Sequence, residues 1–178
     1  GEGVRRARAE VALDPDDAST LALGCPFDLW DILLRDWVGA MRREAPRLVL
    51  QIDVGPGEAL VQRLLTGVLD LAILFDPPRL PELLIRPLTE IPLILVSSAP
   101  AGRPAEALDR GYLMVDWGSS FALSHAQHFP ELATPAARLA CGAQARDLML
   151  DSGGSGYLAV PAVQSELDQG RLFRVPGA

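Results

Sequence analysis

LVQRLLTGVLDLAILF, residues 60–75, says most about the fold, because a helical pattern breaks at a glycine and passes directly into an apolar strand. Gly67 can adopt the left-handed conformation that ends a helix. The strand expected over residues 69–75 does not alternate with polar residues, so both of its faces should be buried in a parallel sheet. Five apolar residues before it share one helical stripe: Leu60, Val61, Leu64, Leu65 and Val68. The stretch therefore predicts one βαβ joint.

Two predicted strands and a helix precede this joint. The first strand covers residues 20–24, and the second covers residues 48–53. Between them, apolar residues at helical spacing predict a helix over residues 28–44, with Asp28 at its N-cap. These elements predict a lobe in which helices cover a parallel sheet.

The remainder of the chain repeats this plan after a loop. A strand over residues 91–96 leads to Ser97 and Ser98, and the loop over residues 99–104 is the predicted hinge between two lobes. In a helix over residues 143–151, Leu148 and Met149 should face inward. The other predicted elements are strands over residues 112–116, 138–141, 157–160 and 172–175 and helices over residues 121–129 and 163–169.

Composition limits the class of protein. A chain of 178 residues with 49% apolar and 22% charged residues can bury a core and is not a disordered chain. No apolar run approaches the ~20 residues that span a bilayer. A net charge of −7 makes this chain alone a poor DNA binder, because nucleic-acid affinity comes mainly from Lys and Arg on phosphates. We expect a cytoplasmic protein without a membrane partner.

The order of strand, glycine turn, helix and Gly-x-Leu-Asp-Leu-Ala-Ile over residues 48–73 resembles the effector-binding half of LysR-type transcriptional regulators. The second-lobe pattern of one LysR subgroup is similar to residues 112–118, Phe121, His125, residues 129–130 and the run from Gly154 to Pro161. The resemblance implies a type 2 periplasmic-binding-protein fold: α/β, with two Rossmann-like lobes of mainly parallel sheet joined by a hinge. We expect a linker remnant at residues 1–17, lobe I at residues 18–96 and the hinge with lobe II at residues 97–178.

This resemblance implies a regulatory domain that binds a small organic effector, expected to be anionic, between the lobes. Family members continue past the equivalent of Val175 to cross back into lobe I, so the closing C-terminal elements are expected to be missing here. DNA contact is expected only through an N-terminal helix-turn-helix that this chain lacks. No catalytic residue, metal or cofactor is expected.

Effector contacts are expected at the turns that follow the strands. Helix N-termini offer amide donors and partial positive charge at those turns, which suits a small carboxylate. Trp117 could wall the pocket, although Gly, Pro and Ser can also be simple turn formers. The candidate contacts are Cys25, Pro26, Phe27, Gly55, Pro56, Gly57, Ser97, Ser98, Trp117, Gly118, Ser119, Ser120 and Gly142.

A homodimer or tetramer is also expected. The resemblance implies that the first helix and second strand of lobe I pack against lobe II of a partner subunit. The residues that would take part are Leu33, Trp37, Met41, Leu48, Leu50 and Leu148.

Other functions remain open or are disfavoured. A solute-binding protein of a transport system shares the fold, so fold alone does not exclude it. Asp151-Ser152-Gly153-Gly154 matches a protease nucleophile loop in sequence, but no β-barrel pattern surrounds it, so we interpret it as a helix end. His125 and His128 have no third ligand at metal spacing, and we expect a surface or interface pair. Cys25 and Cys141 are expected to be reduced thiols rather than a redox pair.

Overall fold

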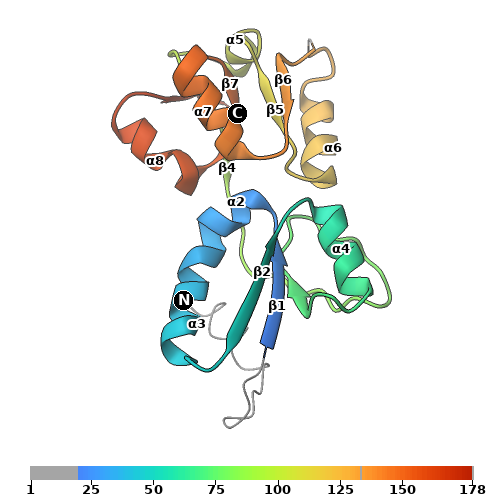
Figure 1. Ribbon diagram of the computed structural model, residues 1–178. Coiled ribbons are helices and arrows are strands. Elements are labelled where there is room, and N and C mark those ends of the chain that lie inside the picture. Colours follow the sequence, from blue (N-terminus) through green and yellow to red (C-terminus); the bar gives the residue numbers. More distant parts are fainter. Residues whose placement is uncertain (1–19, 133, 178) are drawn as a thin grey trace. The chain divides into compact units, whose positions relative to one another are not determined.

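A parallel sheet of three strands, in the order β2-β1-β3, organises the first part of the chain. The computed structural model describes residues 20–132 and 134–177 and divides between Glu90 and Ile91 into two units (Figure 1). The predicted linker at residues 1–17 lies outside the described residues. In unit 1, strand β1 (Thr20–Cys25) is central and pairs along its whole length with β2 (Val49–Val54).

The predicted helix between these strands is present in three consecutive segments: α2 (Phe27–Leu29), the π-helical η1 (Trp30–Leu34) and α3 (Arg35–Glu44). The predicted N-cap was wrong, because Pro26 occupies that position and Asp28 is buried in the first turn. Pro26 is suited to a helix start, since it lacks the N–H that an N-terminal turn leaves unpaired. The amide of Arg35 bonds to the carbonyl of Trp30, five residues back, which defines the π-helical turn.

Helix α4 (Gly57–Leu65) and strand β3 (Leu71–Ala72) complete unit 1. Gly67 has φ +72°, as its predicted role at the helix end requires. Leu60 packs with Ala22 and Leu69 in a buried cluster, whereas Leu65 and Val68 are 40% and 45% exposed, so the predicted stripe was wrong at its C-terminal end. The helix ends at Leu65, and the chain returns to the sheet at β3.

The strand predicted over residues 69–75 was too long and was wrongly expected to be buried on both faces. Strand β3 is two residues long, and it pairs with β1 alone, so it lies at an edge of the sheet. Residues 71–75 are all half-buried. An apolar run without alternation is typical of a central strand, but its position in the sheet depends on pairing, which the run itself does not encode.

Unit 2 contains a mixed sheet. Strand β4 (Leu93–Ser97) lies antiparallel between β7 (Ser155–Ala159) and β8 (Phe173–Arg174). Strands β5 (Leu113–Val115) and β6 (Ala137–Leu139) pair in parallel, and a parallel bridge from Tyr112 to Ser155 joins them to β7. The helices of this unit are α5 (Pro104–Leu108), α6 (Ser119–His128), α7 (Gly142–Ser152) and α8 (Val160–Asp168).

The position of β4 changes the predicted division of the chain. We expected residues 91–96 in lobe I and a hinge at residues 99–104. Because β4 pairs with β7 and β8, it belongs to unit 2, and the loop after it leads into α5 of the same unit. In the part of the chain that the structure describes, no helix is long and apolar enough to cross a membrane.

Candidate functional site

Two of the predicted effector turns meet at the carboxyl edge of the unit 1 sheet. Strand β1 ends at Cys25 and feeds α2, and strand β2 ends at Val54 and feeds α4. The amide of Gly55 donates a hydrogen bond of 3.1 Å to the carbonyl of Cys25, which joins the two turns directly. The first amides of both helices have no intrahelical acceptor, so this edge offers donors and positive partial charge.

The side chains at this edge differ in what they can contact. Cys25 is fully buried, and burial raises the pKa of its thiol to about 11 from an ordinary value of 9.0. Its side chain therefore cannot serve as the predicted ligand contact. Phe27 is half-exposed, and a Cβ added at Gly55 would meet nothing within 4 Å, so this turn is open to solvent in unit 1.

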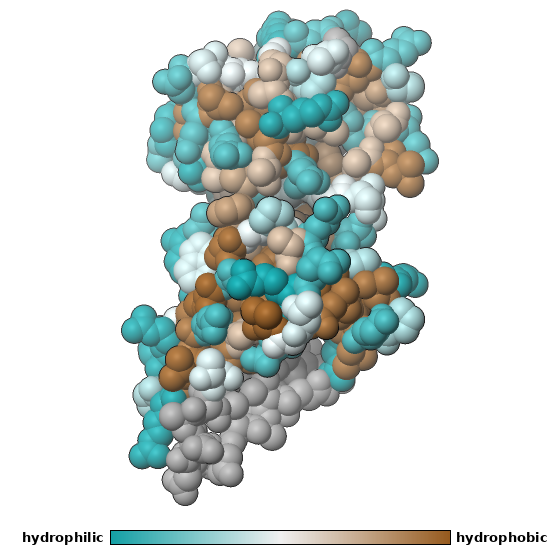
Figure 2. All heavy atoms as spheres, turned by 45° about the vertical axis from the view of Figure 1, so that its right-hand side comes forward, coloured by the Kyte–Doolittle hydropathy of each residue, from teal (hydrophilic) through white to brown (hydrophobic). Residues whose placement is uncertain are grey.

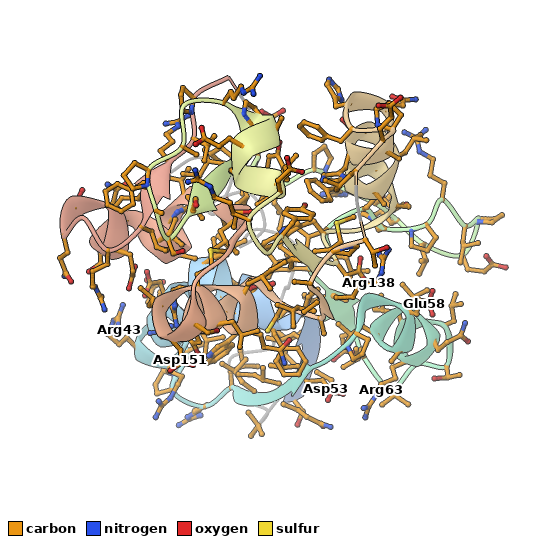
Figure 3. The ribbon with its side chains drawn as sticks, turned by 90° about the horizontal axis from the view of Figure 1, so that it is seen from above. Arg43, Asp53, Glu58, Arg63, Arg138 and Asp151 are labelled. Atoms are coloured by element: carbon orange, nitrogen blue, oxygen red, sulfur yellow. The ribbon has the colours of Figure 1, made fainter. Side chains whose placement is uncertain are left out.

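An ion pair that the sequence analysis missed lies beside these turns. Asp53, at the end of β2, and Arg63, on α4, approach to 2.8 Å between Oδ2 and Nη1 (Figure 3). Asp53 Oδ2 is buried and has no hydrogen-bond partner of acceptable geometry, so the contact is ionic rather than a directed hydrogen bond. No spacing rule links residues 53 and 63, because a strand, a turn and a helix separate them; only the βαβ geometry brings them together.

In unit 2, the turn over residues 116–118 connects β5 to α6. Trp117 is 4% exposed, and its indole Nε1 donates to the carbonyl of Tyr157 at 2.9 Å. Its indole therefore packs in the interior of unit 2 instead of serving as the expected pocket wall. Gly118 has φ +98°, and its amide donates to the Asp116 carboxylate at 3.1 Å. Ser119 and Ser120 begin α6 and are exposed.

The serines after β4 make structural hydrogen bonds. Ser97 is the last residue of β4 and is buried, and its hydroxyl accepts from the amide of Ala99 at 3.4 Å. Ser98 Oγ accepts from the amide of Gly154, and the amide of Ser98 donates to the carbonyl of Gly154, both at 2.9 Å. These bonds fasten β4 to the glycine turn before β7. Gly142 is buried at the start of α7.

Residues 151–154 match a protease nucleophile loop in sequence, and their interpretation as a helix end is confirmed. Helix α7 ends at Ser152, and the amide of Gly153 donates to the carbonyl of Met149. Gly153 and Gly154 have φ +85° and +127°. Ser152 Oγ donates to the carbonyl of Leu148, one turn back, in a bond typical of a serine at a helix end.

The prediction for the histidine pair was wrong for His125. His125 is 7% exposed and lies among the rings of Tyr112, Phe121, Phe129 and Tyr157. Sequence spacing placed it on a helix, but the aromatic cluster forms only when residues 112 and 157 are brought beside that helix. His128 is exposed, as expected. Among residues 20–132 and 134–177, no group of His, Cys, Asp or Glu could hold a metal ion.

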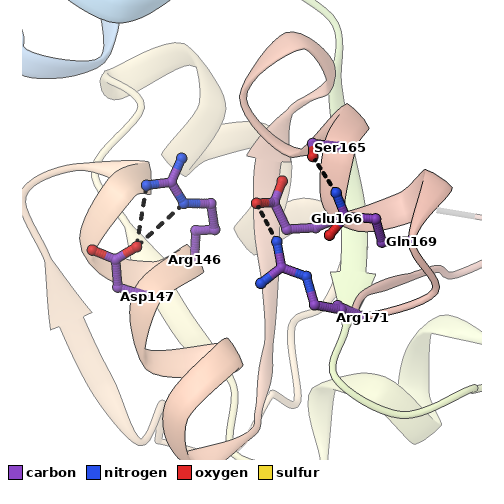
Figure 4. A network of polar contacts seen from close by, with 6 residues as sticks. All are labelled: Arg146, Asp147, Ser165, Glu166, Gln169 and Arg171. Atoms are coloured by element: carbon purple, nitrogen blue, oxygen red, sulfur yellow. Dashed lines mark hydrogen bonds and ion pairs between the residues drawn. The ribbon is translucent and has the colours of Figure 1, made fainter.

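The face drawn in Figure 2 shows apolar and polar side chains interspersed. Leu148 is exposed, contrary to its predicted inward position, while its neighbour Met149 is buried. None of the other five predicted dimer residues is buried within the unit. Figure 4 shows a polar network on α7 and the α8 region, with ion pairs from Arg146 to Asp147 at 3.1 Å and from Arg171 to Glu166 at 3.2 Å.

Comparison with known proteins gives consistent similarities. Residues 16–178 match the model of the LysR substrate binding domain family. The transcriptional regulator HdfR of Yersinia enterocolitica serotype O:8 is 29% identical over 153 residues, which cover 78% of this chain and 50% of that protein. HdfR of Salmonella typhimurium is 30% identical over 142 residues, covering 75% of this chain and 50% of the relative. The chain thus spans about half the length of the curated relatives that it matches.

Solved structures show the same fold. The reduced OxyR regulatory domain from Pseudomonas aeruginosa superimposes with a TM-score of 0.70 at 22% identity, covering 90% of this chain and 82% of that one. The CrgA regulatory domain from Neisseria meningitidis gives a TM-score of 0.72 at 18% identity, covering 88% of this chain and 80% of that one. At these identities the likeness concerns the fold and not the ligand.

Proposed function

The chain belongs to the LysR substrate-binding domain family, and we propose that it is the effector-sensing part of a transcription regulator whose DNA-binding part lies elsewhere in the protein. The HdfR relatives are named HTH-type transcriptional regulators, which supports this role and gives no support to a transport function. The net charge of −7 also supports a separate DNA-binding part. On this proposal the chain acts in the cytoplasm and catalyses no reaction.

We infer that the effector is a small carboxylate. The observation that carries this inference is the hydrogen bond from Gly55 to Cys25, which brings the starts of α2 and α4 to one edge of a parallel sheet. Two helix N-termini at one edge favour an anion, because their free amides and dipoles act together. The start of α6, with Ser119 and Ser120 exposed, offers a further anion contact in unit 2.

Calorimetry against a panel of small carboxylates, amino acids and aromatic acids tests this proposal. For a carboxylate that binds, Ser119→Glu should lower the affinity at least about thirtyfold, roughly 2 kcal/mol, because it places a like charge at the helix start. Ser124→Glu is the matched control, since it adds the same exposed charge to the same helix away from its start. Equal loss in both variants, or a preference for cations, would exclude the helix start of α6 as the anion contact.

We also propose that the domain forms dimers through Leu33, Trp37, Met41, Leu48, Leu50 and Leu148. The support is that these six apolar side chains are not buried in their own unit. Apolar side chains left accessible on a folded unit are typical of a surface that pairs with another protein.

A further inference from the structure

Helix α6 packs on the rest of unit 2 through one buried side chain and one half-buried ring, which meets Tyr157 at 5.5 Å between centroids. His125 is the one buried residue of the helix, and Phe121, one turn earlier on the same face, is half-buried. The other residues of α6 are exposed, including the apolar Leu123. Most helices that pack on a core attach through a stripe of several apolar residues, whereas the only fully buried side chain of α6 is a histidine.

The environment of His125 suits a neutral imidazole. Its Nε2 lies 2.9 Å from the hydroxyl of Tyr112, and the two rings stack with centroids 5.4 Å apart. Phe121 and Phe129, on the same helical face, lie at centroid distances of 5.5 Å and 5.2 Å, and Tyr157 meets the imidazole edge-on at 5.8 Å. A neutral imidazole can hydrogen-bond through one ring nitrogen here, and the rest of the ring packs against aromatic side chains.

A protonated imidazole would lack a compensating charge in this cluster. The titratable groups that face His125 are Tyr112 and Tyr157 from the sheet side and His128 from its own helix. Burial raises the pKa of both tyrosines, so both stay neutral near pH 6, and a charged His128 would repel a second cation. No carboxylate pairs with His125 in the described part of the chain. Burial, and secondarily His128, lower the pKa of His125.

Two physical effects oppose each other when His125 gains a proton. The surrounding aromatic rings can attract an imidazolium through cation–π contacts, which are worth about 0.5–2 kcal/mol. Transfer of an unpaired charge into an apolar cluster opposes protonation more strongly, since buried charges without partners are among the least tolerated groups in proteins. Moving His125 into water removes that penalty. The movement would also have to break the contact of the half-buried Phe121 ring with Tyr157, at 5.5 Å between centroids, and the packing of Phe129, at the C-cap, against the core of unit 2.

We propose that His125 is a proton-sensitive latch, which fastens α6 to the sheet of unit 2 when neutral and releases the helix when protonated. The release is local, because α7, β4 and β7 pack in the core through side chains that do not titrate, such as Met149, Leu95 and Leu158. Below the ordinary histidine pKa of about 6.5, protons favour the released helix, since the exposed imidazole binds them more tightly than the buried one.

The latch has a consequence for effector binding that rests on the function proposed above. Helix α6 begins at Ser119, directly after the turn in which Trp117 is fixed to β7. Release of α6 would free Ser119 and Ser120 while the indole of Trp117 stays in place. Effector affinity should then fall with acidity, which makes the sensor responsive to pH as well as to its ligand.

Nuclear magnetic resonance and hydrogen exchange test the latch without a ligand. The chain has two histidines, so ring resonances of the wild type and of His128→Gln assign both titrations. We expect His125 to titrate below pH 6.5. Over the same pH range, amide protection factors in residues 120–128 should fall at least about tenfold more than those in α7, as expected for local opening.

Two variants at position 125 separate the latch from simple packing. His125→Phe keeps an aromatic ring and cannot be protonated, so α6 should remain protected from pH 7.5 to pH 5.5. If that variant does not fold, His125→Gln removes the titration while keeping a polar side chain, and the residual protection of α6 should not change with pH. His128→Gln, the matched control on the exposed face, should keep the pH-dependent opening of α6, with its midpoint moved slightly toward higher pH because the repulsion from His128 is removed.

The proposal fails if His125 titrates at or above pH 6.5, if α6 and α7 lose protection together, or if either position-125 variant keeps the wild-type pH response. An effector that binds with pH-independent affinity while α6 opens would leave the latch intact and contradict only the link to the effector site.

Discussion

Asp70 and Ala22 bind each other through two hydrogen bonds, one of which uses the aspartate side chain. The amide of Ala22 donates to Asp70 Oδ2 at 2.7 Å, and the amide of Asp70 donates to the carbonyl of Ala22 at 2.8 Å. The carboxylate thus extends the ladder between β1 and β3 by one step before regular pairing starts at Leu23 and Leu71. This gives a physical role to the aspartate of the Gly-x-Leu-Asp-Leu-Ala-Ile pattern.

Replacing Asp70 by Ala should lower the free energy of unfolding of unit 1 by about 1–2 kcal/mol, because the amide of Ala22 loses a charged acceptor. Asp70→Asn should cost less, since the amide oxygen can still accept. Urea unfolding followed by tryptophan fluorescence measures the change, and Glu82→Ala, at an exposed carboxylate, is the control. If Asp70→Ala has no larger effect than Glu82→Ala, the carboxylate does not stabilise the pairing of β3 with β1.

Gly154→Ala should destabilise unit 2 by more than about 2 kcal/mol, because it combines an unfavourable backbone conformation with a steric clash. Gly154 has φ +127°, and a Cβ there would lie 2.6 Å from the carbonyl oxygen of Gly111. Gly170→Ala is the matched control, since Gly170 has φ +66° but open space around it, and should cost about 1 kcal/mol. Thermal unfolding by circular dichroism compares the two, and equal losses would mean that the contact with Gly111 is unimportant.

Cys25 should be unreactive in the folded protein at pH 8. Burial raises the pKa of this thiol to about 11, so very little thiolate is present, and the side chain is inaccessible. Because the folded pKa exceeds the ordinary 9.0, the stability linked to this group is present below pH 9 and is lost as the pH rises through about 11. In a Cys141→Ser variant, where Cys25 is the remaining cysteine, iodoacetamide labelling should require unfolding. Rapid labelling of the folded variant would show that the carboxyl edge of β1 opens.

Trp37→Glu should shift a dimer toward monomer, because a charge placed in an apolar interface loses its hydration without gaining a partner. Trp37 is half-buried on α3, so the substitution should leave the fold of unit 1 intact. Sedimentation velocity at micromolar concentration measures the assembly, and Asp36→Ala, at the exposed neighbouring position, is the control. A wild-type chain that is already monomeric at high micromolar concentration would contradict the proposed interface.

Elements that depend on local periodicity and on turn chemistry could be predicted from the amino-acid sequence. Helix α4 with its left-handed Gly67, strands β1 and β2, and the glycine-terminated helix α7 follow from residues that are neighbours in the chain. The turns that begin the helices could be predicted for the same reason, because helix starts and strand ends have local signals.

Which elements pair, and what each side chain contacts, could be read only from the folded chain. β3 lies at a sheet edge, β4 belongs to unit 2, and Trp117 points into the interior of that unit, because strands and side chains distant in sequence occupy the neighbouring positions. His125, predicted to belong to a surface or interface pair, is the buried centre of an aromatic cluster for the same reason. Its partners lie 13 and 32 residues away in the chain, at Tyr112 and Tyr157, and pairing over such separations is set by sheet topology and not by helical spacing.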